Sequence, residues 1–175
     1  MGWPRAVLLG LLVGLLGGGC AIDPPPVTLP RVDAPELSAA EYQARREQAL
    51  QGAVRVNEQT GQQEFTGHSE YVILSDFQFS PSTLRFKSGS LVRVRLSNTA
   101  LVTHYFGGEE FFRLGAEPVN LLGSYVPSGQ HHVPVAPYTD RDIYLFIKDP
   151  GVYLLDCFVP NHRVAGMVGQ LIVEP

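Results

Sequence analysis

The stretch from Phe77 to Asn98, FQFSPSTLRFKSGSLVRVRLSN, decides the fold class of this chain. Its last part, LVRVRLSN, alternates strictly, with Val92, Val94 and Leu96 on one side and two arginines on the other. A period of two predicts a β-strand with one buried face and one solvent-exposed face. The segments before it are rich in aromatic and β-branched residues and are separated by turn residues, so they are predicted to be strands as well.

Further strands are predicted on both sides of this stretch. YVILSDFQFSP begins before it and overlaps its start, and DIYLFIKDPG and VYLLDC follow it, separated by an Asp-Pro-Gly turn, before GQLIVEP closes the chain. Short strands with frequent Gly and Pro turns indicate an all-β fold, an antiparallel β-sandwich. Residues 109–137 form a long insertion of mixed character, in which EEFFRL is compatible with a helical turn.

The first twenty residues, MGWPRAVLLGLLVGLLGGGC, have the pattern of an export signal. The apolar run after Arg5 is too short and too interrupted by glycine to suit a membrane-spanning helix. Small residues ending in cysteine resemble a bacterial lipoprotein signal, with residues 1–19 removed and Cys20 lipidated, although Leu16 lies one position further from the cysteine than is usual. An ordinary secretory signal is the alternative. Both interpretations predict an exported protein of the cell envelope or periplasm, and a lipid would anchor it to a membrane.

Residues 20–66 are predicted to connect this anchor to the folded domain. The segment AIDPPPVTLPRVDAP is rich in proline and favours an extended spacer. SAAEYQARREQALQG then has a helix-forming composition, with Ser38 and Glu41 spaced as a capping box and Gly52 as a stop. The remaining residues, 67–175, are predicted to form one domain.

The charged residues argue against a nucleic-acid partner. The formal net charge is −4, and the 13 lysines and arginines are too few and too scattered for a basic surface. Arg85, Lys87, Arg93 and Arg95 are predicted to form a basic stripe on the solvent-exposed face of a sheet. Docking of an acidic redox partner on that stripe is the alternative to a merely solvated face.

A second stretch, DCFVPNHRVAGMVG, places Cys157, His162 and Met167 five residues apart. If Cys20 carries lipid, Cys157 has no partner for a disulfide, and an exported protein rarely keeps a bare thiol without a use. The cysteine ends a predicted strand, and the loop after it is long enough to fold around one point. A buried cysteine without function and a methionine that only packs are the alternatives.

The natural candidate for a fourth group is His104 in SNTALVTHYF, because it follows the alternating strand and a sandwich can bring strand ends together. Two imidazoles, a thiolate and a weak axial thioether are the ligand set of a blue-copper electron-transfer site. The apolar residues Phe106, Phe158, Val159 and Pro160 are expected to keep bulk water away from such a site.

Three segments, FQFSPSTLRFKSGSLVRVRLSN, THYF and CFVPNHRVAGMVGQLIVE, together resemble the cupredoxin family, which includes plastocyanin, azurin and rusticyanin. The shared features are a Phe-x-Phe-x-Pro opening, a Lys-x-Gly turn, a strand ending in asparagine, and a Cys-His-Met loop before the last strand. The resemblance covers roughly residues 71–175. It implies a Greek-key β-sandwich and one type 1 copper ion bound by His104, Cys157, His162 and Met167.

The sequence departs from the family at two positions. Tyr105 stands where plastocyanin and azurin have an asparagine that pins the two ligand loops together, and Asn161 stands where glycine is common before the second histidine. The adjacent His131 and His132 point to opposite sides of an extended segment, so they are not expected to bind one metal. They are predicted to be an exposed pair, with a weak second metal contact or a partner surface as the alternative.

These features predict a one-electron carrier of the cell envelope that exchanges electrons with redox protein partners, and not an enzyme with a small-molecule substrate. The alternative is a copper-handling protein that delivers, stores or senses the metal, although such sites are usually rich in exposed methionine or histidine. An oxidase or nitrite reductase is disfavoured because Asp156 and Phe158, and not histidines, flank Cys157.

Overall fold

The computed structural model describes residues 37–175, so the predicted signal, Cys20 and the proline-rich spacer lie outside the described residues. In chain order, the elements are α1 (Ala39–Gln51), β1 (Val54–Val56), β2 (Gln63–Phe65), β3 (His68–Ser75), β4 (Gln78–Ser80), β5 (Thr83–Lys87), β6 (Leu91–Asn98), β7 (His104–Gly107), η1 (Phe111–Gly115), β8 (Ala116–Val119), β9 (His132–Val135), β10 (Asp140–Ile147), β11 (Gly151–Asp156) and β12 (Val168–Glu174). The predicted all-β class is confirmed.

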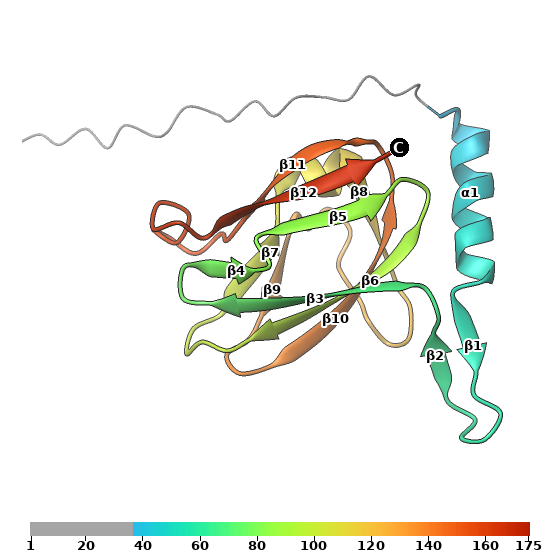
Figure 1. The fold of residues 1–175 in the computed structure, drawn as a ribbon, viewed down its shortest axis with the longest axis horizontal. Helices are drawn as coiled ribbons and strands as arrows, with labels where there is room; N and C mark the ends of the chain where they lie inside the picture. The colour runs from blue at the N-terminus through green and yellow to red at the C-terminus, as the bar shows by residue number, and fades with distance from the viewer. Residues whose placement is uncertain (1–36) are drawn as a thin grey trace, which may run out of the picture.

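Two β-sheets packed on each other form the body of the protein (Figure 1). One has the strand order β4-β3-β6-β10-β8 and the other has the order β11-β12-β5. Most neighbouring strands are antiparallel, but β3 pairs with β6 and β12 pairs with β5 in parallel. Between β3 and β6 the chain crosses to the other sheet to form β5, so it returns in its original direction. The predicted β-sandwich is present and mostly antiparallel, but these two parallel pairs make it mixed.

The core lies between the inner faces of the two sheets. On β6, Val92, Val94 and Leu96 are buried while Arg93 and Arg95 point to the other side, as the alternation predicts. Burial of such side chains is the main source of stability in a domain of this size. The buried residues that meet them from β5 and β12 are Leu84, Phe86, Leu171 and Val173.

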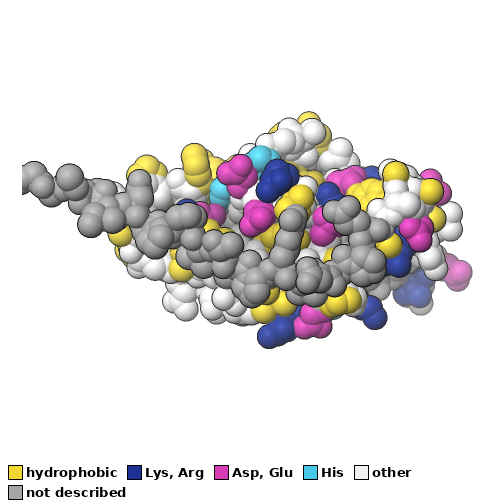
Figure 2. Space-filling model, turned by 90° about the horizontal axis from the view of Figure 1, so that it is seen from above, with side chains coloured by type: hydrophobic (Ala, Val, Ile, Leu, Met, Phe, Trp, Pro, Cys, Tyr) yellow, Lys and Arg dark blue, Asp and Glu magenta, His cyan; other side chains and the backbone are white. Residues whose placement is uncertain are grey.

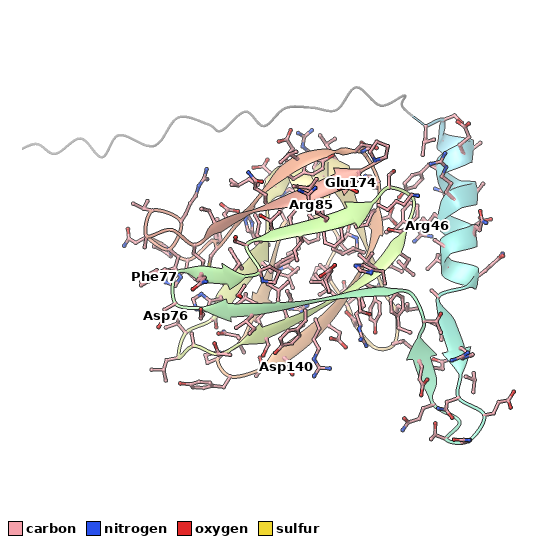
Figure 3. All side chains as sticks on the ribbon, in the orientation of Figure 1. Arg46, Asp76, Phe77, Arg85, Asp140 and Glu174 are labelled. Carbon is pink, nitrogen blue, oxygen red and sulfur yellow. The ribbon has the colours of Figure 1, made fainter. Side chains whose placement is uncertain are left out.

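The four predicted stripe residues lie in different sheets. Arg85 and Lys87 belong to β5 and the other two to β6, and the outer faces of a sandwich point in opposite directions. Arg85 also forms an ion pair of 2.9 Å with Glu174 (Figure 3), and Arg95 forms one of 2.7 Å with Asp140. Acidic and basic side chains are interspersed on the face seen in Figure 2. The single basic stripe expected from the sequence does not form.

The predicted N-terminal helix is present as α1. Ser38 is its N-cap and forms the capping box with Glu41, as expected. The helix docks on the sandwich through Glu117 of β8, which accepts hydrogen bonds from the Tyr42 hydroxyl and, over 3.1 Å, from Arg46 Nε. Among the described residues, no helix combines the length and the apolar character needed to cross a membrane.

Two parts of the chain are more ordered than expected. The β1–β2 hairpin after α1 was not predicted, and it lies with the helix at the end of the molecule opposite the loop between β11 and β12 (Figure 1). The insertion contains a π-helical turn and two strands, β8 and β9. Pro118 and Pro134 lie within these strands, which is tolerated because both are edge strands. The pairing of β9 with β7 matters most, because β7 begins at His104.

Candidate metal centre

His104, Cys157 and His162 meet at one end of the sandwich. The Nδ1 atoms of both histidines lie 3.8 Å from the sulfur of Cys157, and the three donor atoms are all within 4.8 Å of one another. For bonds of about 2.0 Å to nitrogen and about 2.3 Å to sulfur, a separation of this size fits a single ion with near-trigonal angles. Within the described part of the chain, no other group of three such side chains converges in this way.

Met167, the third residue of the loop that the sequence predicts as a ligand, is fully buried. The backbone N–H of Cys157 donates to the Met167 carbonyl oxygen over 3.3 Å, and the N–H of Met167 donates to the His162 carbonyl oxygen over 2.8 Å. The Ala165 N–H closes the loop further by donating to Asn161 over 2.9 Å. These hydrogen bonds hold the cysteine, histidine and methionine positions in one compact unit.

A buried asparagine, Asn98, positions His104, which lies far from the ligand loop in the sequence. The Asn98 amide nitrogen donates to the carbonyl oxygens of Val102 and Val135, at 2.8 and 2.9 Å, and its amide oxygen accepts from the Ala100 N–H at 2.9 Å. A buried amide with partners on both ends is fully satisfied and therefore geometrically specific. It turns the chain back after β6, so that β7 begins with His104 directed at the sulfur.

The sulfur of Cys157 is almost entirely enclosed, with 2% of the residue exposed. Burial raises the pKa of the Cys157 thiol, and backbone N–H groups of Val159 and Tyr105 act in the opposite direction. The Tyr105 N–H lies 3.4 Å from the sulfur. At the first position where the sequence departs from the cupredoxin pattern, the backbone therefore contacts the site directly. Without a metal the thiol keeps its proton, and metal binding must displace it.

The two imidazoles differ in their surroundings. His104 is 0% exposed, whereas His162 is half-buried and packs edge-on against the ring of Phe77, with 5.1 Å between ring centroids. Burial and the nearby His162 lower the pKa of His104, while Asp76, 3.6 Å from its Nε2 atom, opposes the shift. His104 is thus neutral at neutral pH, which is the form that binds metals. Figure 3 shows Asp76 and Phe77 at the turn between β3 and β4, far from α1.

Two residues near the cluster have left-handed backbone conformations. Asn161 has φ of 69°, a conformation that asparagine tolerates better than other non-glycine residues. The second departure from the family pattern therefore leaves the backbone of this loop unstrained. Phe77 has φ of 62°, which is unfavourable for a bulky residue and occurs at functional sites held by their surroundings. Its strained turn places an aromatic ring on His162.

The expected apolar cover is only partly correct. Phe106 is fully buried, but Pro160 is exposed and Phe158 is 70% exposed. The chain leaves the sandwich after Cys157, so the next side chain points outward. Phe158 packs instead between the rings of Tyr105 and His132.

The prediction of an exposed histidine pair is wrong for His132. Its side chain is 18% exposed, and its Nε2–H donates to Asp156 over 2.8 Å. His131 lies apart from this contact and lines a cavity beside the insertion. Nothing in the local sequence distinguishes the two histidines, because the difference arises only when β9 pairs with β7.

The donor set fits a type 1 copper ion. A thiolate and a thioether suit the cuprous ion, imidazole suits both oxidation states, and two histidines with one cysteine in a trigonal arrangement are typical of this class of site. The low exposure of His104 and Cys157 adds a dry environment, which helps to set the reduction potential.

Part of the chain is similar in sequence to a curated cuproprotein. No protein-family model matches the chain. An alignment of 106 residues shows 26% identity with the copper-resistant cuproprotein CopI of Rubrivivax gelatinosus, and it covers 59% of this chain and 64%, just under two thirds, of that relative.

Solved structures that resemble the chain include two auracyanins. The reduced protein from Roseiflexus castenholzii has a TM-score of 0.46 and 18% identity, over 63% of this chain and 99% of that one. Auracyanin A from Chloroflexus aurantiacus, a blue copper protein, has a TM-score of 0.41 and 19% identity, over 61% and 99%. The multicopper oxidase McoA from Aquifex aeolicus has a TM-score of 0.49 and 14% identity, over 70% and 31%.

Three findings bear on the family. The fold is a two-sheet sandwich, one end of it carries the buried histidine-cysteine-histidine cluster with Met167 in the same loop, and the relative in the sequence comparison is a cuproprotein. The described residues therefore form a two-sheet β-sandwich with a candidate copper site at one end, and the chain is similar in sequence to a cuproprotein.

Proposed function

We propose that this protein is a one-electron carrier whose type 1 copper ion is bound by His104, Cys157, His162 and, as a weak axial donor, Met167. The observation that carries the proposal is the arrangement of two Nδ1 atoms, each 3.8 Å from one buried sulfur. The bound copper would supply a couple between the cupric and cuprous states. Because Asn98 and the hydrogen bonds of the ligand loop hold the donors in place, little has to move when the charge changes.

The partly exposed His162 is the route for electrons in this proposal. His104 and Cys157 are enclosed, so a redox partner reaches the site most directly over the edge of His162. Exposed apolar side chains lie on the neighbouring segments, among them Phe77 and Val164. A small apolar contact of this kind suits the brief association that electron exchange requires.

The proposed location is the cell envelope. The pattern of residues 1–19 supports export, and lipidation of Cys20 would attach the domain of residues 67–175 to a membrane through residues 20–66. In this arrangement the protein is a carrier and not an enzyme, and its partners are larger redox proteins. The sequence pattern of the signal supports this part of the proposal.

A copper-handling role is the second candidate, because the curated relative is named a copper-resistant cuproprotein. The burial of Cys157 and His104 favours a resident ion over one that exchanges quickly. Transfer of cuprous ion to a chelator of modest affinity separates the two: a carrier loses its ion slowly, whereas a handling protein releases it within the time of mixing.

The experiment that tests the carrier role is an optical and electron paramagnetic resonance spectrum of the oxidised, copper-loaded protein. Intense blue or green absorption from thiolate-to-copper charge transfer is expected, with one copper per chain and reversible bleaching by a one-electron reductant. Cys157→Ser is the matched control, since it removes the thiolate at nearly constant size and must abolish the band. A wild-type protein that binds copper tightly without colour contradicts the proposal.

A further inference from the structure

His132 contacts both residues that flank Cys157. Its Nε2–H donates to Asp156 Oδ1 over 2.8 Å. Its ring also packs on Phe158, with 5.4 Å between centroids and 34° between the ring planes. The histidine begins β9 whereas Asp156 ends β11, so these contacts join an insertion strand to the point where the chain leaves the other sheet.

Asp156 and Phe158 also contact the residues that follow His162 and His104 in the chain. The second carboxylate oxygen of Asp156 lies 3.6 Å from an Arg163 guanidinium nitrogen, and Arg163 directly follows His162. Tyr105 directly follows His104, and its ring packs edge-on against Phe158 at 6.1 Å. Residues next to His104, Cys157 and His162 in the chain are therefore connected to one another through Asp156 and Phe158. His132 contacts both of these residues.

The burial of this group makes the connection energetically significant. The side chains of His132 and Asp156 are only 18% and 13% exposed, so their hydrogen bond is shielded from water. A hydrogen bond to a carboxylate in such a place is stronger than an exposed ion pair, which contributes little. Phe158 is 70% exposed, and its ring contacts are with Tyr105 and His132.

We infer that His132 is a positioning residue of the metal centre. Through Asp156 and Phe158 it fixes the end of β11 and the start of the ligand loop. The angle at which the Cys157 sulfur faces the two imidazoles then depends on a residue 25 positions earlier in the chain. The inference rests on the proposed function only for the identity of the bound ion.

The test compares three variants with the wild type. His132→Phe keeps an aromatic ring for Phe158 but removes the donor to Asp156, and His132→Gln keeps a donor at a similar distance. His131→Gln is the matched control, because this neighbouring histidine lies on the cavity side. Each protein is loaded with copper, and its absorption, paramagnetic resonance spectrum and reduction potential are measured, together with the unfolding midpoint of the metal-free form.

Changes to residues that orient metal ligands typically alter metal affinity by about 10- to 100-fold. If His132→Phe weakens one oxidation state about tenfold relative to the other, the potential shifts by about 59 mV. The charge-transfer band and the copper hyperfine splitting should change with it. His132→Gln should restore most of the wild-type values, and His131→Gln should leave them unchanged.

Amide hydrogen exchange of the metal-free protein gives an independent readout. Exchange at Ala165 and Met167, whose N–H groups close the ligand loop, should be faster in His132→Phe than in the wild type. Unchanged exchange, or a lower unfolding midpoint with wild-type spectra and potential, would overturn the inference. A wild-type protein without the charge-transfer band would instead refute the electron-carrier proposal, and the exchange measurement would still decide whether His132 fixes the loop.

Discussion

The side-chain amide of Asn98 donates to the carbonyl oxygen of Val135 over 2.9 Å, which joins the end of β6 to β9 in the interior of the protein. Because β9 also pairs with β7, this hydrogen bond holds the two-stranded sheet that begins with His104. The insertion is therefore part of the support of the metal centre.

Replacing Asn98 with leucine should destabilise the fold and loosen His104. The substitution leaves two carbonyl oxygens and one N–H without their partner, at a cost of about 1–3 kcal/mol for each buried group that water does not reach. Urea unfolding of the metal-free protein measures the loss. Asn120→Ala, at an exposed position, should stay within about 0.5 kcal/mol of the wild type. Equal midpoints for both variants would contradict this account of Asn98.

Replacing Met167 with leucine should raise the reduction potential with little loss of stability. The two side chains have similar volumes, and such exchanges usually cost less than about 1.5 kcal/mol. Loss of the thioether removes a weak donor, and the cuprous ion tolerates the lower coordination number better than the cupric ion. Voltammetry of the loaded protein and urea unfolding of the metal-free form check the two parts. An unchanged potential would mean that Met167 only packs.

The stability provided by Tyr42 should disappear in alkaline solution. Burial, together with the hydrogen bond to Glu117, raises the pKa of Tyr42 well above its usual value of 10.0. The unfolded chain therefore loses this proton first, so the stabilisation is complete below about pH 10 and declines as the pH rises further. Tyr42→Phe should be less stable than the wild type at pH 8, and the difference should shrink by pH 11. Thermal unfolding at both pH values measures it, and a constant difference would argue against the hydroxyl as the cause.

Replacing Gly169 with alanine should be strongly destabilising. A methyl group there would overlap the backbone oxygen of Ser82 and press on Leu155, so β12 would have to move away from β5, at a cost of about 1–3 kcal/mol or more. Gly52→Ala is the matched control, since no atom lies within 4 Å of its added methyl group. Thermal unfolding should show a lower midpoint for the first variant only.

Local signals in the sequence predicted the parts of the fold that depend on nearby residues. The alternation along β6 reports which side faces the core, and the Ser38–Glu41 spacing reports a helix start, because both patterns reflect the geometry of a single element. The spacing of Cys157, His162 and Met167 likewise belongs to one loop. We predicted His104 because a fourth metal ligand was needed and this histidine follows the end of a strand. It is separated from Cys157 by 53 residues.

The remaining features arise between distant segments and leave no periodic pattern. The β8 and β9 strands are short and contain proline, so their propensity is weak and their pairing with β10 and β7 decides their structure. The parallel pairs depend on how the chain crosses between sheets. The hydrogen bond from His132 to Asp156 spans 24 residues and joins two polar side chains that, read alone, suit a solvated surface equally well.

The enclosure of the Cys157 sulfur also affects how easily this cysteine is oxidised. Oxidation to sulfenic acid and beyond requires an accessible thiolate, and here both requirements are poorly met, since 2% of the residue is exposed and burial raises the thiol pKa. In the metal-free protein, peroxides are therefore expected to oxidise this sulfur slowly. A newly made chain should thus stay able to bind its ion after folding under oxidising conditions that would inactivate a surface cysteine.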